Sequence, residues 1–256
     1  MAIDFRTVRA VLFDLDGTLT VDGGPLPGAA ATLQLLRERG IPFRICSNTT
    51  TRSQRSMAQM LTAAGLPVDP DQVFSAPGAA REYLRRRKAR TCWLLLAEDT
   101  LTDFSEFNHD SDDPELIVIG DIGERWDYAL MNRLFQLVRN GAEIVALHRG
   151  KSWLTGGQVK LDIGAFVSGL EYATGKPAIV IGKPSRDFYL MALSSLKLPA
   201  SEVIMVGDDL DNDVAGAQAV GLKAVLVTSG KSDSAPALIQ PDLTLKSVAE
   251  LKALFT

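Results

Sequence analysis

The sequence predicts an α/β fold in which a doubly wound parallel core sheet carries an inserted α/β domain. Three observations lead to this prediction. Strand-like and helix-like hydrophobic patterns alternate along the whole chain. Polar segments follow several of the strand-like runs, as expected where the carboxyl ends of parallel strands form a site. The stretch 79–178 carries no such segment and repeats its own strand-helix alternation.

The expected strands are short apolar runs, and the expected helices place apolar residues three to four positions apart. In chain order the strands are 8–13, 41–46, 91–97, 115–119, 143–147, 178–181, 202–206, 224–227 and 243–245. The helices are 28–38, 52–64, 77–87, 128–139, 161–173, 186–196, 212–220 and 248–254.

Two carboxylates one residue apart follow the first strand. The run 8–13 ends in Asp14 and Asp16, with Gly17 and Thr18 directly after them. Paired acids at the end of a buried strand are costly unless a cation such as Mg²⁺ neutralises them. Gly17 allows a sharp turn. Because one Asp can attack phosphorus while the other handles a proton, the segment predicts phosphate chemistry.

Hydrogen-bond donors for an anion follow the second strand. The run 41–46 ends in Ser47 and Asn48, before the helical pattern over 52–64. Short donors beside a helix N-terminus form an anion site. We therefore expect Ser47 and Asn48 to face the same ligand as the two acids.

A lysine follows a later strand. Lys183 comes after the run 178–181 and Gly182, where its charge can reach a phosphate. Pro184 is expected in the first turn of the next helix.

An acidic segment follows the strand 202–206. It contains Asp208, Asp209, Asp211 and Asp213 and predicts a metal site. Asp211 and Asp213 lie at a helix start, where the helix dipole favours negative charge, so a structural role is the alternative for both.

In this order the segments resemble the hallmarks of the haloacid dehalogenase superfamily of Mg²⁺-dependent aspartyl-phosphate hydrolases. These are an Asp-x-Asp-x-Thr turn, a Ser or Thr at a strand end, a Lys, and a Gly-Asp-x-x-x-x-Asp loop. The gap between Asn48 and Lys183 resembles the branch with a large α/β cap between the second and third hallmarks. The segments 47–50, 169–174 and 180–184 look most like the subgroup of the phospholysine/phosphohistidine/inorganic pyrophosphate phosphatase and its hydrolase-like domain relatives.

The resemblance implies catalytic roles. Asp14 is the nucleophile that forms an aspartyl-phosphate, and Asp16 is the general acid and base. Mg²⁺ binds the side chains of Asp14 and Asp208 and the backbone carbonyl of Asp16. Lys183 neutralises charge on the nucleophile and the phosphate.

The resemblance also implies supporting roles. Asp213 forms an ion pair with Lys183. Asp209 either reaches the metal through water or caps the following helix. Thr18 steadies the turn at Asp16. The side chains expected at the substrate are Thr18, Ser47, Asn48 and His148.

The domain division follows from the spacing of the hallmarks. Residues 1–78 and 179–256 carry all of them and are expected to form the catalytic core, leaving 79–178 as the cap. A homodimer that forms through the cap is a further partner expected for this chain.

Cap residues at the mouth of the site are expected to select the leaving group. The strand 143–147 is followed by His148, Arg149 and Lys151, which are the candidates for specificity. A hydrogen-bonded surface role is the alternative for His148.

The expected function is a Mg²⁺-dependent phosphatase, a phosphoric monoester hydrolase, acting on small phosphorylated molecules, with phosphoramidates or pyrophosphate as further substrates. Two alternatives are a phospho-accepting receiver domain and a phosphomutase of the same superfamily. Receivers carry an adjacent acid pair after the first strand. The mutases usually place a helical cap between the first two hallmarks, where this chain has only 20–41.

The amino-acid composition agrees with a soluble enzyme. Its 256 residues, 46% hydrophobic and 23% charged, suffice for one large or two modest domains. A net charge of -4 argues against a nucleic-acid partner. Without an apolar run near ~20 residues or a signal-like N-terminus, we expect no membrane partner and a cytoplasmic location.

Cys46 and Cys92 are expected to be buried thiols.

Overall fold

The computed structural model describes residues 3–155, 158–229 and 239–255. It divides the chain into two compact units. The first comprises Met1–Ser47, Gln54–Ser75 and Lys183–Thr256, and the second comprises Asn48–Ser53 and Ala76–Gly182. The second unit therefore extends beyond the expected 79–178 at both ends and takes in a short earlier segment.

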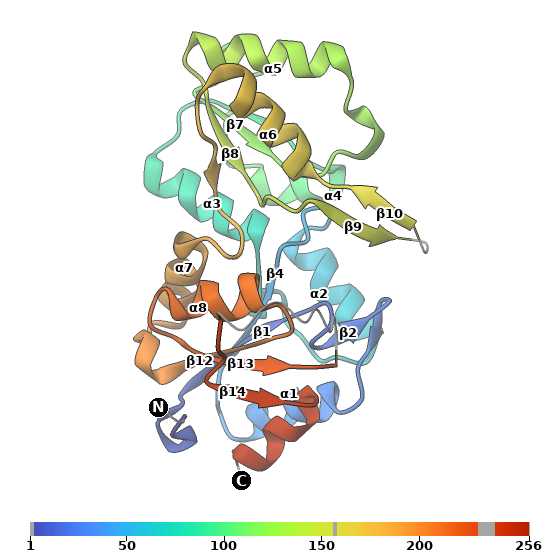
Figure 1. Ribbon diagram of the computed structural model, residues 1–256, viewed down its shortest axis with the longest axis vertical. Coiled ribbons are helices and arrows are strands. Elements are labelled where there is room, and N and C mark those ends of the chain that lie inside the picture. Colours follow the sequence, from blue (N-terminus) through green and yellow to red (C-terminus); the bar gives the residue numbers. More distant parts are fainter. Residues whose placement is uncertain (1–2, 156–157, 230–238, 256) are drawn as a thin grey trace. The chain divides into compact units, whose positions relative to one another are not determined.

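The first unit is built on a parallel sheet of six strands in the order β14-β13-β12-β1-β4-β5 (Figure 1). Their bounds are β1 (Ala10–Asp14), β4 (Phe43–Ser47), β5 (Val73–Ser75), β12 (Val203–Gly207), β13 (Lys223–Val227) and β14 (Leu243–Leu245). Strand β1 is central and buried along its whole length, which is why its sequence is continuously apolar rather than alternating.

Helices surround this sheet in the sequence order expected of a doubly wound fold. They are α1 (Ala29–Glu38), α2 (Gln54–Ala63), α7 (Arg186–Leu196) and the short α8 (Gly216–Gln218). A π-helix, η6 (Leu210–Ala215), precedes α8, and the 3₁₀ segments are η1 (Phe5–Thr7), η2 (Pro70–Gln72), η5 (Ala200–Glu202) and η7 (Val248–Leu254). A small antiparallel hairpin joins β2 (Thr20–Val21) to β3 (Gly24–Pro25).

The core of the first unit lies between one sheet face and three helical segments. Val11 and Phe13 of β1 pack in one cluster with Leu33 of α1, Met57 of α2 and Leu251 of η7. On β4 and β5, Arg44 and Phe74 instead contact α7, through Ser195 and Phe188. Helices therefore cover both faces, as the sequence predicted.

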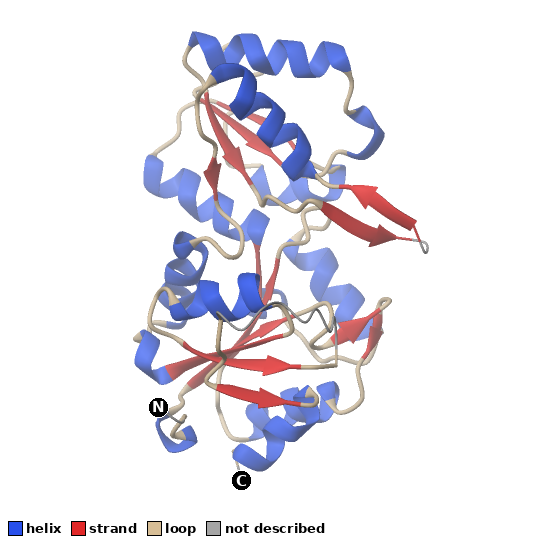
Figure 2. Cartoon of the chain, in the orientation of Figure 1, coloured by secondary structure: helices blue, strands red, loops and turns tan. Residues whose placement is uncertain are grey.

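The second unit has its own parallel sheet, in the order β11-β8-β7-β6. Figure 2 shows the strands of this unit in red and its helices in blue. Its strands are β6 (Cys92–Leu95), β7 (Leu116–Ile119), β8 (Glu143–Ala146) and β11 (Ile179–Val180). Its helical elements are α3 (Ala76–Arg87), α4 (Glu98–Leu101), η3 (Thr102–Phe104), η4 (Gly123–Arg125), α5 (Tyr128–Asn140) and α6 (Ile163–Thr174). Apolar residues of α5 and α6 share one cluster with Ile117, Ile119 and Ile144 of the sheet.

An antiparallel hairpin of β9 (Ser152–Thr155) and β10 (Gln158–Leu161) completes the second unit. Strand β11 pairs with β8, not with the core sheet, which carries the boundary of this unit to Gly182. Within 3–155, 158–229 and 239–255, no helix has both the length and the apolar character needed to cross a membrane.

Candidate active site

Three of the expected site residues lie at the carboxyl ends of neighbouring strands in the first unit. Asp14 is the last residue of β1, Ser47 is the last residue of β4, and Asp208 follows β12 directly. The parallel registers place Asp14 beside Cys46 and Phe13 beside Val206. Because β12, β1 and β4 are consecutive in the sheet, their polar ends share one edge.

Lys183 connects two of the acids. Its Nζ lies 2.5 Å from Asp14 Oδ1 and 2.7 Å from Asp213 Oδ1. The Lys183 side chain is only 4% exposed and that of Asp213 only 1%. Burial opposes the charge of Lys183, but the Asp14 and Asp213 carboxylates outweigh it and hold the Lys183 pKa well above its ordinary value. The ammonium is therefore charged throughout the physiological pH range.

The acids of this cluster outnumber its cation. Carboxylate oxygens of Asp14, Asp208 and Asp213 lie within 4.8 Å of one another, and all three residues are buried. When all are ionised, Lys183 leaves two negative charges unbalanced. Oxygen donors with an excess charge of this size fit Mg²⁺. Both oxygens of Asp213 already accept hydrogen bonds, from Lys183 and from the Asp209 backbone N–H.

Gly17 makes room for Asp208. A Cβ atom at Gly17 would lie 2.1 Å from Asp208 Oδ2, and the glycine has a φ of +93°. Both the left-handed backbone and the close approach require a residue without a side chain. The turn after β1 is thus shaped around an acid that comes from a distant part of the sequence.

Two threonines contact the paired acids. Thr18 was expected to steady the turn at Asp16; its backbone N–H donates to the Leu15 carbonyl in that turn, and its Oγ1 lies 3.4 Å from Asp14 Oδ2. Thr20 contacts Asp16, with Oγ1 3.2 Å from Asp16 Oδ1 and 3.2 Å from the Leu15 carbonyl. The turn folds Thr20 back, because Gly17 N–H donates to the Thr20 carbonyl. No spacing rule in the sequence separates these two threonines.

The acidic loop after β12 is fixed by its own side chains. Asp209 accepts hydrogen bonds from the backbone N–H groups of Asp211 and Asn212, at 2.9 and 2.7 Å. It therefore caps η6, which is one of the two roles expected for it. The helix expected over 212–220 begins as a π-helix at Leu210.

Other expectations near Lys183 need correction. Pro184 lies outside α7, because Ser185 is the N-cap of that helix. Tyr189 of α7, which the sequence did not single out, is buried and donates its hydroxyl proton to the Asn212 carbonyl at 2.5 Å. It thus ties α7 to the acidic loop.

Cys46 is not positioned as a nucleophile. The residue is fully buried, and burial raises its thiol pKa to about 12, although Lys183 opposes the shift. The thiol is therefore protonated at neutral pH. Cys92 is also buried, as expected.

His148 and Asn48 belong to the second unit. His148 follows β8 and is buried; its Nδ1 accepts the Gly150 backbone N–H at 3.0 Å, and its Nε2 lies 3.7 Å from Asp162 Oδ1. Burial lowers the pKa of His148, while Asp162 and Asp121 oppose this shift. The alternative of a surface role for His148 is therefore wrong, and because Nδ1 accepts a hydrogen bond, the proton of the neutral ring is assigned to Nε2.

Arg149 has a structural partner. Its Nη2 donates to Glu171 Oε2 at 2.7 Å and to Ser168 Oγ at 3.0 Å, both on α6. The loop after β8 is also tied to α6 by the Gly164 N–H, which donates to the Gly150 carbonyl. Arg149 therefore anchors this loop.

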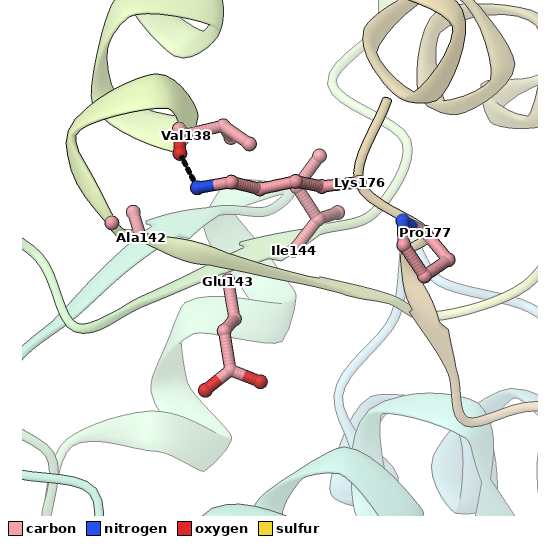
Figure 3. A pocket seen from close by; sticks show the side chains of 7 residues that line it. Val138, Ala142, Glu143, Ile144, Lys176 and Pro177 are labelled. Atoms are coloured by element: carbon pink, nitrogen blue, oxygen red, sulfur yellow. Dashed lines mark hydrogen bonds between the residues drawn. The ribbon is translucent and has the colours of Figure 1, made fainter. Parts of the chain in front are cut away.

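A separate pocket of about 270 Å³ lies in the second unit (Figure 3). Lys176 runs along it toward the Val138 carbonyl, to which Nζ donates at 2.5 Å. Glu143 is engaged with Arg87 at 2.6 Å. The lining residues are Val138, Gly141, Ala142, Glu143, Ile144, Lys176 and Pro177, and none of the expected site residues is among them.

Family models agree with the motifs. A model described as haloacid dehalogenase-like hydrolase matches residues 11–108, and one described as HAD-hydrolase-like matches residues 180–251. The chain belongs to the haloacid dehalogenase-like hydrolases. Membership in a hydrolase family disfavours the receiver-domain alternative.

Individual relatives support the same assignment. Haloacid dehalogenase-like hydrolase domain-containing protein 2 from Homo sapiens is 36% identical over 94% of this chain and 93% of its own length. Phospholysine phosphohistidine inorganic pyrophosphate phosphatase from Xenopus laevis is 35% identical over 90% of this chain and 87% of its own. The predicted family and subgroup are confirmed.

A solved structure supports the fold. The 4-nitrophenylphosphatase from Thermotoga maritima superimposes with a TM-score of 0.91 over 99% of this chain and 100% of its own, at 24% identity. The predicted fold class is therefore confirmed.

Proposed function

We propose that this hydrolase is a Mg²⁺-dependent phosphatase that acts on small phosphorylated molecules through an aspartyl-phosphate on Asp14. The observation that carries the proposal is the buried cluster in which Lys183 bridges Asp14 and Asp213 beside Asp208. Fixed charges of both signs at a strand end suit phosphoryl transfer, because its transition state needs mainly positioning and charge stabilisation.

In the first step, an oxygen of Asp14 attacks phosphorus. Asp16 donates a proton to the leaving group, an oxygen or, in a phosphoramidate, a nitrogen. It later removes a proton from the water that attacks phosphorus of the aspartyl-phosphate, which releases phosphate and frees Asp14. The contact between Thr20 and Asp16 favours this role, since a proton donor must keep its orientation through two steps.

Phosphoryl oxygens are bound by Ser47 and Asn48, while the ammonium of Lys183 offsets their charge. Mg²⁺, held by the side chains of Asp14 and Asp208 and the backbone carbonyl of Asp16, would neutralise the negative charge shared by the acids and the phosphate. Asp213 serves the site indirectly, because both its oxygens are engaged in holding Lys183 and Asp209.

The substrate class follows from the relatives' names. One relative is named for phospholysine, phosphohistidine and inorganic pyrophosphate, and a structural neighbour is named for 4-nitrophenyl phosphate. We infer that phosphoramidates, pyrophosphate and aryl phosphates are the first compounds to test, with His148 as the cap residue that contributes to selectivity.

The test is phosphate release from this panel by purified protein with Mg²⁺, compared with Asp14→Asn. We expect turnover by the wild type and a loss of at least about a hundredfold in the variant, because an amide is a poor nucleophile. Transfer of the phosphoryl group to a second substrate hydroxyl, with no release to water, would instead favour the phosphomutase alternative.

A further inference from the structure

The Asn48–Ser53 segment directly follows Ser47, the last residue of β4, yet it groups with the second unit. It begins with Asn48, one of the proposed phosphoryl-binding residues. Asn48 therefore joins the end of β4 to a segment that groups with the second unit.

Thr50 is the first attachment point. Its carbonyl accepts a hydrogen bond of 2.7 Å from Thr100 Oγ1, and its own Oγ1 accepts the Asp121 backbone N–H at 3.0 Å. Thr50 also packs against Gly120, where an added Cβ would lie 3.4 Å from Thr50 Cβ and closer still to Leu96. The polar and apolar sides of Thr50 are thus both engaged.

Ser53 is the second attachment point. Asp99 Oδ2 accepts the Ser53 backbone N–H at 2.8 Å, and Asp99 Oδ1 accepts the Ser53 hydroxyl at 3.1 Å. One carboxylate thus binds two groups of the same residue, which fixes the backbone as well as the side chain.

These anchors are buried. Thr50, Ser53 and Thr100 are between 0% and 4% exposed, and buried polar groups cost free energy unless their hydrogen bonds are made. Only Asn48 and Thr49 lie between the β4 strand and the first anchor. Such a short connection leaves the Asn48 backbone few conformations once Thr50 is fixed.

We propose that Asp99 and Thr100 are positioning residues for substrate binding: they hold Thr50 and Ser53, and through them the Asn48 amide, in its phosphoryl-binding position. The proposal rests on the function proposed above and extends it to two residues that touch neither substrate nor metal. It predicts that changing these residues weakens binding of the phosphoryl group, which all substrates share, whatever the leaving group.

The test measures KM and kcat for 4-nitrophenyl phosphate and pyrophosphate, and the dissociation constant of inorganic phosphate by calorimetry. For Asp99→Ala we expect KM and the phosphate dissociation constant to rise together by roughly tenfold, as for one lost hydrogen bond to a charged group, with a smaller change in kcat. Thr100→Val, in which valine has nearly the shape of threonine, should also raise KM and the phosphate dissociation constant. This variant carries the test if Asp99→Ala does not fold.

Two controls separate positioning from general stability. Asp99→Asn should restore most of the binding, since its carbonyl can accept the Ser53 N–H while its amide donates to Ser53 Oγ. Glu98→Ala, at an exposed neighbouring position on α4, should change neither KM nor the phosphate dissociation constant.

The outcomes are distinct. A wild type that binds phosphate, with Asp99→Ala and Thr100→Val binding it equally well, would overturn the positioning roles and leave the phosphatase intact. Asp99→Ala and Thr100→Val proteins that melt at lower temperature but bind phosphate as the wild type does would also overturn the positioning roles. A wild type that neither binds nor releases phosphate would overturn both proposals.

Discussion

The ammonium group of Lys183 lies 2.5 Å from an oxygen of Asp14, and both residues are buried. The same ammonium lies 2.7 Å from Asp213, so one cation holds two acids from opposite ends of the sequence. Stability and the proposed chemistry therefore depend on the same ion pairs.

Replacing Lys183 by Met should affect both properties. Removing one partner of a buried ion pair leaves uncompensated charge, so we expect the free energy of unfolding to fall by about 3–5 kcal/mol, and hydrolysis to be lost. Chemical denaturation and phosphate release measure the two effects. The double variant Lys183→Met/Asp213→Asn also removes one of the two carboxylates that lose their cation. It should therefore be more stable than Lys183→Met but remain inactive. Full activity in Lys183→Met would rule out the role proposed for this cation.

Thr20→Val tests the contact with Asp16. Loss of the hydroxyl should lower kcat by roughly tenfold with little change in KM, because Asp16 loses its orientation without losing its acidity. Thr32→Val is the matched control: Thr32 is also buried and donates to a carbonyl, that of Val248. Equal kcat in the two variants would show that Thr20 only stabilises the fold.

Metal dependence should appear in stability as well as in rate. A chelator should abolish turnover and Mg²⁺ should restore it, while Ca²⁺ should inhibit, since its larger coordination shell suits the site poorly. At about 100 times its Kd, Mg²⁺ should stabilise the wild type by about 2.7 kcal/mol. Asp208→Asn should lose most of this gain, as should Gly17→Ala, whose added Cβ would collide with Asp208. Undiminished activity in excess chelator would refute the metal assignment.

The buried His148 predicts a dependence of stability on pH. Burial lowers the pKa of His148 from its ordinary value, against the opposing effect of Asp162 and Asp121, so below the ordinary histidine pKa the unfolded chain binds more protons than the folded chain. Its contribution is lost as the pH falls below about 6.5. The stability difference between wild type and His148→Gln should therefore shrink between about pH 7.5 and pH 5.5. A difference independent of pH would mean that His148 titrates normally.

The sequence predicted the strands that carry the site because they are continuous apolar runs ended by polar residues. Strand β1, strand β4 and strand β12 all lie within a residue or two of their expected ranges. Their shared edge followed from parallel topology. Short elements were missed: β5 has only three residues, and the β9–β10 hairpin has an irregular pattern of exposed apolar residues, including Val159 and Leu161.

Other features could not be predicted because they depend on tertiary contacts. The strand expected over 178–181 was placed at the start of the second core segment, 179–256, but β11 pairs with β8 of the second unit. The contact between Thr20 and Asp16 depends on a turn in which the Gly17 N–H donates to the Thr20 carbonyl. The anchoring of Thr50 by Thr100 joins residues fifty positions apart and leaves no local pattern.

The most direct test of the account is the covalent intermediate itself. In Asp16→Asn, which lacks the general acid and base, we expect a phosphorylated enzyme to accumulate after mixing with Mg²⁺ and 4-nitrophenyl phosphate, whose leaving group departs without protonation. Mass spectrometry of rapidly acidified protein should place one phosphoryl group on the peptide that contains Asp14, and Asp14→Asn/Asp16→Asn should carry none. A wild type that releases phosphate, combined with an Asp16→Asn protein that never carries a phosphoryl group on Asp14, would contradict the nucleophilic role of Asp14.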